Sequence, residues 1–317
     1  MDTLPDELLF EVINQLYLED VAAVWNISIA NRHLHRIAKE LLYRCYSLDD
    51  FGPGLFIRTL ASSPNLERCV QHIDWDCRVL AKNLVSTSDA FKLPEALTTA
   101  EFRHISERVG FDKKGRKKTM TRGKIENLNA WLAGSGEEEY FNMFMLFTSK
   151  VKTIFIARPW TWSRKVMWFK PALDSQIFTN LHKADINGGM RIGNVLPLFL
   201  LPSMRTLKLS HISIDRNQAG VGPPYKWEVN TAVWKRLERE GSSIEHLHLP
   251  NVGTDTLDIS RMLGSFTNLK DFEFALRGHG LGEYNVDLRT LLCAIAHHHT
   301  SLTSLTLQDH RLEQDPS

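Results

Sequence analysis

The chain has few cysteines, and their spacing matches neither a metal site nor a disulfide framework. The four are Cys45, Cys69, Cys77 and Cys293, and no two of them form a C-x-x-C pair. Small disulfide-stapled domains and zinc modules need denser and more regular cysteines. We therefore expect all four to be reduced and buried, where cysteine behaves as a small apolar residue.

The sequence also lacks an excess of charge and any long apolar run. Its formal net charge is only +1, so no overall field draws the protein to nucleic acid or to an anionic membrane. No stretch reaches the 18 or so apolar residues that a membrane-spanning helix needs, and the first residues are acidic where a secretory signal would be basic. We expect an intracellular protein, cytoplasmic or nuclear or both, with neither membrane nor nucleic acid as a partner.

Signatures of catalysis are missing as well. The sequence contains no G-x-S-x-G, G-x-x-x-x-G-K-[ST] or H-E-x-x-H motif. Three adjacent histidines, His297 to His299, would point in different directions on a helix and could not meet at one ion. The sequence therefore predicts no enzyme activity, no cofactor and no metal site.

The chain has the composition of an ordinary globular protein, and its first segment is amphipathic. Hydrophobic residues make up 43% of the 317 positions and charged residues 24%, which suits a small module joined to one larger domain. Pro5, followed by two acidic residues, marks a helix start. The periodicity predicts a helix to about residue 17 with one apolar face, a second helix from Asp20, and a third from Asn31. The apolar residues of the first helix are Leu8, Leu9, Val12, Ile13 and Leu16.

The order of these signals carries a family resemblance. Leu4-Pro5-Asp6-Glu7-Leu8-Leu9 is followed by Val12-Ile13, Leu16, Asp20-Val21, Asn31-Arg32 and Leu34. This succession resembles an F-box, with Ala22 and Ala23 in place of larger aliphatic residues. The resemblance implies that residues 1–47 bind a Skp-type adaptor and, through it, a cullin scaffold. The residues it assigns to adaptor binding are Leu4, Pro5, Leu8, Leu9, Ile13, Leu16, Val21 and Leu34. The alternative is that these helices only cap a larger fold.

A short pattern, apolar-x-x-apolar-x-apolar, recurs seven times after residue 50. Its last three positions alternate as on a strand with one buried face, and several copies follow a Ser-Leu or Asn-Leu step. The first residues of the last five copies are 23 to 40 positions apart. The copies start at Val70, Val151, Leu181, Met204, Ile244, Leu269 and Leu302.

This pattern resembles the leucine-rich-repeat unit. The resemblance implies an α/β fold in which residues 48–317 form an irregular leucine-rich-repeat-like solenoid of short parallel strands and return helices. Helical periodicity at 194–201, 230–240 and 287–298 supports strand–helix alternation, which favours a parallel sheet with right-handed crossovers. An unrelated α/β domain with similar buried strands is the alternative.

The interval of about 86–147 departs from this pattern. It reads as helical pieces around a basic run, and the sequence predicts an insertion there. The basic run is a candidate localisation or docking loop, formed by Lys113, Lys114, Arg116, Lys117 and Lys118. A solvated loop without a function is the alternative.

Two loops rich in aromatic residues are candidates for substrate contacts. Tryptophan, tyrosine and arginine dominate binding hot spots, and loops leaving a sheet often carry function. The candidate substrate-binding residues are Arg158, Trp160, Trp162, Arg164, Tyr225 and Trp227. The alternative for the tryptophans is that they cover the core.

Together these observations predict a substrate-recognition subunit of an SCF-type cullin-RING ubiquitin ligase, whose protein substrate is unknown. The competing hypothesis is a non-catalytic scaffold of leucine-rich-repeat-like form that acts outside a ubiquitin ligase, possibly in the nucleus. Exposure of the apolar residues on the first helix separates the two hypotheses, because an adaptor needs an uncovered surface.

Overall fold

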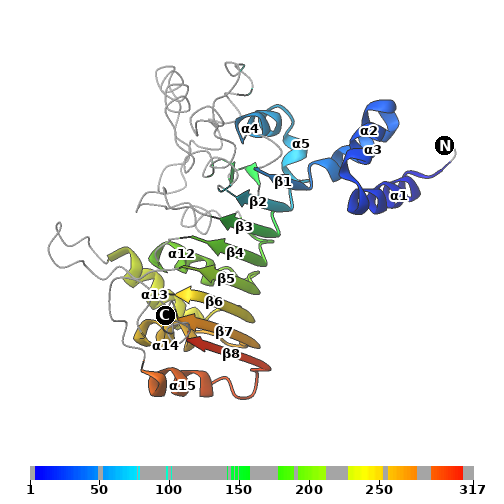
Figure 1. Cartoon of the computed structure of the whole chain (residues 1–317). Helices are drawn as coiled ribbons and strands as arrows, with labels where there is room; N and C mark the ends of the chain where they lie inside the picture. Colours follow the sequence, from blue (N-terminus) through cyan, green and yellow to red (C-terminus); the bar gives the residue numbers. More distant parts are fainter. Residues whose placement is uncertain are drawn as a thin grey trace, which may run out of the picture.

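The protein is an α/β protein built on one eight-stranded, all-parallel sheet (Figure 1). The computed structural model describes residues 4–48, 53–76, 78, 98, 101, 141, 144, 145, 147, 148, 150–157, 178–188, 192–211, 228–252, 256–276 and 287–309. The spatial order of the strands is their order in the chain, so each new strand adds to the edge left by the previous one.

Helices separate the strands along the chain. The strands are β1 (Cys45–Ser47), β2 (His72–Asp76), β3 (Thr153–Ala157), β4 (Lys183–Asn187), β5 (Thr206–Ser210), β6 (His246–Val252), β7 (Asp271–Leu276) and β8 (Ser304–Asp309). The helices are α1 (Asp6–Glu19), α2 (Val21–Ala30), α3 (Arg32–Leu42), α4 (Pro53–Ser62), α5 (Pro64–Glu67), α12 (Ile192–Phe199), α13 (Glu228–Glu240), α14 (Thr256–Leu263) and α15 (Leu288–Ala296). In this part of the chain no helix is long and apolar enough to cross a membrane.

The seven predicted strands are confirmed as β2 to β8. Their first inward residues align across the sheet, from Ile73 beside Ile154 to Phe272 beside Leu305. The pattern has an eighth copy that was not predicted. Tyr43, Tyr46 and Leu48 follow it, and β1 lies within this copy. Since β1 pairs with β2, the last residues of the segment predicted as the 1–47 module belong to the sheet.

One backbone arrangement repeats at every step of the sheet. The carbonyl before each strand accepts hydrogen bonds from two successive N–H groups of the next unit. Arg44 O, for example, lies 2.8 Å from Gln71 N and 3.0 Å from His72 N. The other carbonyls that accept in this way belong to Gln71, Lys152, His182, Arg205, Glu245 and Lys270. This arrangement fixes the stagger between neighbouring strands, so the apolar side chains stay aligned whatever the length of the return segment.

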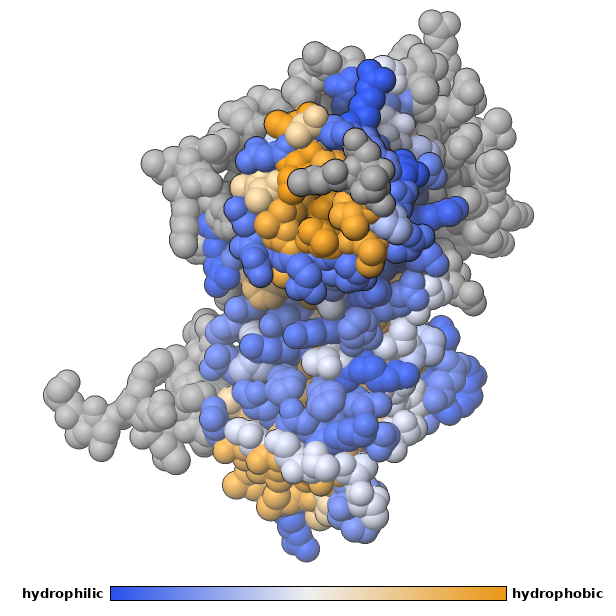
Figure 2. Space-filling view, turned by 90° about the vertical axis from the view of Figure 1, so that its right-hand side faces the viewer, coloured by the Kyte–Doolittle hydropathy of each residue, from blue (hydrophilic) through white to orange (hydrophobic). Residues whose placement is uncertain are grey.

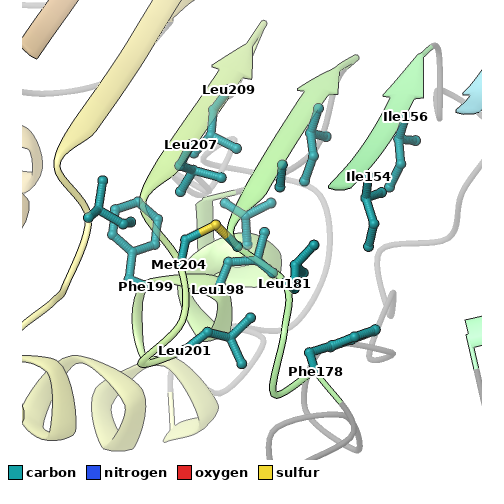
Figure 3. Close-up of a cluster of buried hydrophobic side chains, with 14 of the residues drawn as sticks. Ile154, Ile156, Phe178, Leu181, Leu198, Phe199, Leu201, Met204, Leu207 and Leu209 are labelled. Atoms are coloured by element: carbon teal, nitrogen blue, oxygen red, sulfur yellow. The ribbon is translucent and has the colours of Figure 1, made fainter. Parts of the chain in front are cut away.

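The core lies between the sheet and the helices that cover one of its faces. Strand residues alternate between this core and the opposite, polar face, as their burial pattern shows. In Figure 3, Ile154 and Ile156 of β3 and Leu207 and Leu209 of β5 lie on the same side of the sheet as Leu198 of α12. The predicted helices near 194, 230 and 287 are confirmed as α12, α13 and α15, whereas α4 and α14 were not predicted.

The prediction that the cysteines are buried was wrong for the three that the structure describes, while Cys77 lies outside the described residues. Cys45 and Cys293 are exposed, and Cys69 is half-buried. All three are free thiols, as expected. Cys45 lies on the polar face of β1 and Cys293 on the outer side of α15, so neither position needs a small apolar residue.

An aromatic cluster closes the β1 end of the core. The rings of Tyr46 and Phe144 have their centroids 4.5 Å apart, and Trp75 meets Phe141 edge to face at 4.8 Å. Phe56 of α4 stacks on Phe144 at 5.4 Å. Since Phe141 and Phe144 come from the end of the predicted insertion, that part of the insertion contributes to the core.

A buried carboxylate joins α4 to another part of the insertion. Glu101 accepts hydrogen bonds from Ser62 Oγ at 2.7 Å and from Arg58 Nε at 2.9 Å. It also accepts one from Thr98 N at 2.6 Å, while its own N–H donates to Thr98 Oγ1 at 3.3 Å, which is a capping box. Burial alone would raise the pKa of Glu101, but these hydrogen bonds outweigh it and lower the pKa to about 2.

Phe144→Ala should destabilise the protein strongly, because it removes a fully buried ring that contacts three other aromatic residues. We expect a loss of about 3–5 kcal/mol in the free energy of unfolding, measured by urea denaturation. Leu55→Ala on the exposed side of α4 is the control and should change stability by under about 0.5 kcal/mol. A loss below about 1 kcal/mol for Phe144→Ala would contradict the packing of this cluster.

Glu101 should make the free energy of unfolding depend on pH in the acid range. Its pKa is lower in the folded protein than the ordinary value of 4.5, so its contribution is complete above that pH and disappears as the pH falls toward 2. Removing the charge with Glu101→Gln should cost up to about 3 kcal/mol at neutral pH and little near pH 2. Denaturation curves of both proteins between pH 2 and 7 measure this difference, and parallel pH profiles would rule the contribution out.

Candidate docking surface

The three N-terminal helices have a hydrophobic core of their own. It is distinct from the core beneath the sheet and is formed by Leu9, Ile13, Val24, Ile37, Ala38 and Leu41. Leu16 and Leu34 are half-buried and pack against it. Helices α1 to α3 thus form a small module that holds its shape by packing, with little apolar surface committed to the sheet.

Polar contacts mark where each helix of this module begins. Asp20 Oδ1 accepts a hydrogen bond from Ala23 N at 3.1 Å and caps α2, and Asn31 Oδ1 accepts one from His33 N at 2.7 Å and caps α3. Asp6, in the first turn of α1, forms an ion pair with Arg36 and lies 3.1 Å from His33 Nε2. The predicted starts at Asp20 and Asn31 are therefore confirmed. Pro5 precedes α1, whose first turn bonds to the Pro5 carbonyl.

The outer side of α1 and α2 is apolar and exposed. Two rows with four-residue spacing, one from Leu4 to Val12 and one from Val21 to Ile29, make up most of it. We call this surface the N-terminal apolar patch, formed by Leu4, Leu8, Val12, Leu18, Val21, Trp25 and Ile29, each between 44% and 70% exposed. Figure 2 shows it as the upper orange area, over the N-terminal helices.

The predicted adaptor-binding residues divide into three groups by exposure. Leu4, Pro5, Leu8 and Val21 are exposed. Two others, Leu9 and Ile13, are only 5% and 3% exposed, so they build the core of the module and can support a docking surface only indirectly. The remaining two, Leu16 and Leu34, are the half-buried residues that flank this core.

The single apolar face predicted for the first helix is in fact two faces. Val12 points outward with Leu4 and Leu8, while Leu9 and Ile13 point inward. Trp25 and Ile29 of α2 extend the outward surface, and the sequence analysis did not assign them to it. Their four-residue spacing from Val21 was the available signal, but spacing alone does not tell which of two apolar rows faces the core.

Arg44 connects the N-terminal module to the sheet. Its Nη1 donates a hydrogen bond to Asn14 Oδ1 of α1 at 2.8 Å, and its guanidinium lies 5.9 Å from the centroid of the Tyr17 ring. Its carbonyl is the acceptor that joins β1 to β2. One residue therefore holds α1 and the first step of the sheet together.

The polar face of the sheet carries polar side chains of β4 to β7 that contact one another. Lys208 Nζ lies 3.8 Å from Asp185 Oδ2, and His248 lies between Asp271 at 3.2 Å and Glu273 at 2.8 Å. Burial raises the pKa of Asp185, against the lowering effect of the neighbouring lysines. Within the described ranges, no three histidine, cysteine or acidic side chains are placed to hold a metal ion.

The other predicted sites lie outside the residues that the structure describes. These are the candidate substrate-binding residues Arg158, Trp160, Trp162, Arg164, Tyr225 and Trp227, and the basic loop Lys113, Lys114, Arg116, Lys117 and Lys118. They stay predictions from the sequence.

Comparison with known proteins adds no relative. No protein-family profile matches the chain, and no curated protein matches it significantly. The interpretation of the N-terminal module therefore depends on its own residues and geometry.

Ile13→Ala and Leu8→Ala should separate core from surface within α1. Ile13→Ala leaves a cavity in the small core, and we expect a loss of about 2–4 kcal/mol in the free energy of unfolding of these helices. Leu8→Ala, on the exposed row, should change stability by under about 0.5 kcal/mol. Thermal melts followed by circular dichroism measure both. Equal losses would contradict the two-faced arrangement of α1.

Proposed function

We propose that the protein is a substrate-recognition subunit of an SCF-type cullin-RING ubiquitin ligase, whose N-terminal module binds a Skp-type adaptor. The observation that carries the proposal is the N-terminal apolar patch on a three-helix module with its own core. A module that is already packed does not need these side chains for its own folding. Together with the F-box-like order of residues 4–34, the patch supports a dedicated interface.

The physical chemistry of the patch favours a permanent or tight partner. Monomeric soluble proteins rarely expose contiguous apolar patches of more than a few hundred Å² without a function. Fully burying one large aliphatic side chain contributes about 1.5–3 kcal/mol, before the costs of association are subtracted. Seven partly exposed apolar residues thus supply enough burial for a specific complex, with Trp25 as the best-suited anchor.

The sheet would then recognise the substrate. Within the α/β class, we interpret the sheet and its helices as an irregular leucine-rich-repeat-like solenoid. The sequential strand order, the aligned inward residues and the carbonyl arrangement repeated at seven steps support this interpretation. The polar face of β4 to β7 and the aromatic loops are the candidate contacts for a protein substrate.

In this function the chain performs no covalent chemistry. A receptor accelerates ubiquitin transfer by holding a lysine of the substrate near the charged conjugating enzyme, which raises the effective concentration of the two groups. A receptor of this kind works best when it holds the adaptor and the substrate in a fixed relative orientation. The bond between Arg44 and Asn14, at the junction of module and sheet, supports that requirement.

Binding to a purified Skp-type adaptor tests the proposal. In the triple variant Leu8→Ala, Val21→Ala, Trp25→Ala, three residues that are each about half exposed lose their apolar surface. We expect the wild-type chain to bind and the variant to bind at least about tenfold more weakly, because hot-spot residues dominate interfaces. Isothermal titration calorimetry measures both affinities.

The matched control is Leu288→Ala, Leu292→Ala, Leu305→Ala, which removes three equally exposed leucines from the opposite end of the molecule. This control should bind the adaptor as the wild type does. If a folded wild-type chain shows no binding, the ligase hypothesis is wrong, and the scaffold that acts outside a ubiquitin ligase becomes the better interpretation of the patch.

A further inference from the structure

Among the described strands, β8 stands at the end of the sheet and is paired along one edge. β8 pairs with β7 on one side, and none of the strands in the described ranges lies on its other side. At the seven preceding steps, the carbonyl before the strand accepts two N–H groups from the next unit. The carbonyl of Thr303 holds the equivalent place at β8. The backbone of β8 therefore presents the same hydrogen-bonding edge that each earlier strand offers to its neighbour.

The same end of the molecule exposes apolar side chains both on the sheet, in β8, and on the helix α15. In β2 to β7 the two inward residues of each strand are at most 2% exposed, whereas their equivalents in β8, Leu305 and Leu307, are 44% and 40% exposed. Leu288 and Leu292, one turn apart on α15, are 59% and 50% exposed. We call these four leucines the C-terminal apolar patch. Figure 2 shows an apolar area at the lower end of the molecule, far from the N-terminal one.

The composition of this end permits it to face a copy of itself. The strand Ser304–Asp309 contains no lysine and no proline, which are the residues that commonly protect an edge strand from pairing. The patch itself is uncharged, so two copies brought together meet no repulsion between like charges at its centre. A strongly charged partner, in contrast, would find no complementary charge among the four leucines.

We propose that β8 and α15 form the interface of a homodimer, in which β8 of one copy pairs with β8 of the second. A two-fold axis makes this pair antiparallel and the contact identical from both sides. Centred on Thr306, the pairing sets Leu305 of each copy opposite Leu307 of the other, on the core side of both sheets. The sheet then continues through the axis, and both N-terminal patches stay at the far ends, free to bind a partner.

Solution mass tests the proposal on the full chain. We expect a dimer in sedimentation equilibrium and a monomer for Leu305→Lys, Leu307→Lys, which places like charges opposite each other across the axis. Because both leucines are about 40% exposed, these changes should leave the fold intact, which circular dichroism checks. The triple variant of the N-terminal patch is the matched control and should remain dimeric.

A cysteine at the axis tests the register. In a chain whose four native cysteines are changed to serine, Thr306→Cys should give a disulfide-linked dimer under mild oxidation, because antiparallel partners on the axis lie within disulfide reach. Lys208→Cys, exposed on the same polar face in the middle of the sheet, should remain monomeric on a denaturing gel.

Three results would overturn the proposal. They are a wild-type chain that is monomeric at all soluble concentrations, a dimer that survives both lysine substitutions, and equal cross-linking of the two cysteine variants. If the monomeric chain instead captures an extended peptide along β8, the edge is a strand-addition site for another protein. Adaptor binding is measured separately with the N-terminal patch, so failure of the dimer leaves the proposed function untouched, and the reverse also holds.

Discussion

The inward side chains of a strand in this protein are buried by the strands and helices next to them. Strands β2 to β7 each have a strand on both sides, and the two inward side chains that align across them are at most 2% exposed. Ile154, for example, has Ile73 and Ala184 beside it. A single strand cannot bury its own inward side chains, so each unit depends on its neighbours. The first and last strands of the sheet need some other group to cover their inward side chains.

The two extremities end in different ways. At β1 the core is closed by aromatic rings, some of them from a segment far along the chain, and the N-terminal helices stand beyond them. At β8 the inward leucines Leu305 and Leu307 are 44% and 40% exposed, and none of the described strands lies beyond them. Of the thirteen large apolar residues exposed in the described ranges, seven belong to the N-terminal patch and four to the C-terminal one. The exposed apolar residues therefore gather at the two ends of the described architecture, where the proposed interfaces lie.

The strands could be predicted from the sequence because their signal is local. A strand with one buried face must alternate, and the aligned apolar residues of β2 to β8 do so. β1 was not predicted although Tyr43, Tyr46 and Leu48 follow the same rule, because the F-box resemblance assigned residues 1–47 to the helical module. The capping box of Thr98 and Glu101 corresponds to a T-x-x-E signal in the sequence, which is also local but was not among the predicted features.

Which apolar residues stay exposed could not be predicted in the same way. Leu8 and Leu9 are adjacent and identical, yet one is 53% exposed and the other 5%. The difference arises from where α2 and α3 pack against α1, which is set by the caps at Asp20 and Asn31 and by contacts between helices. Likewise Leu305 and Leu247 hold equivalent strand positions, yet Leu305 is 44% exposed and Leu247 is fully buried, because β8 has a described strand on one side and β6 has one on both. These are properties of neighbours in space, which the periodicity of one segment does not contain.

Arg44 shows how the two levels of organisation meet. As part of the repeated pattern, its carbonyl only has to accept two N–H groups, and any residue can supply that carbonyl. Its side chain is free to serve another purpose, and it binds Asn14 and lies near the ring of Tyr17. The backbone of Arg44 thus fixes the first step of the sheet, and its side chain fixes the orientation of the N-terminal module relative to the sheet. In the proposed function, in which the chain positions an adaptor and a substrate, this division lets the docking surface be oriented without disturbing the hydrogen bonds that hold the strands in register.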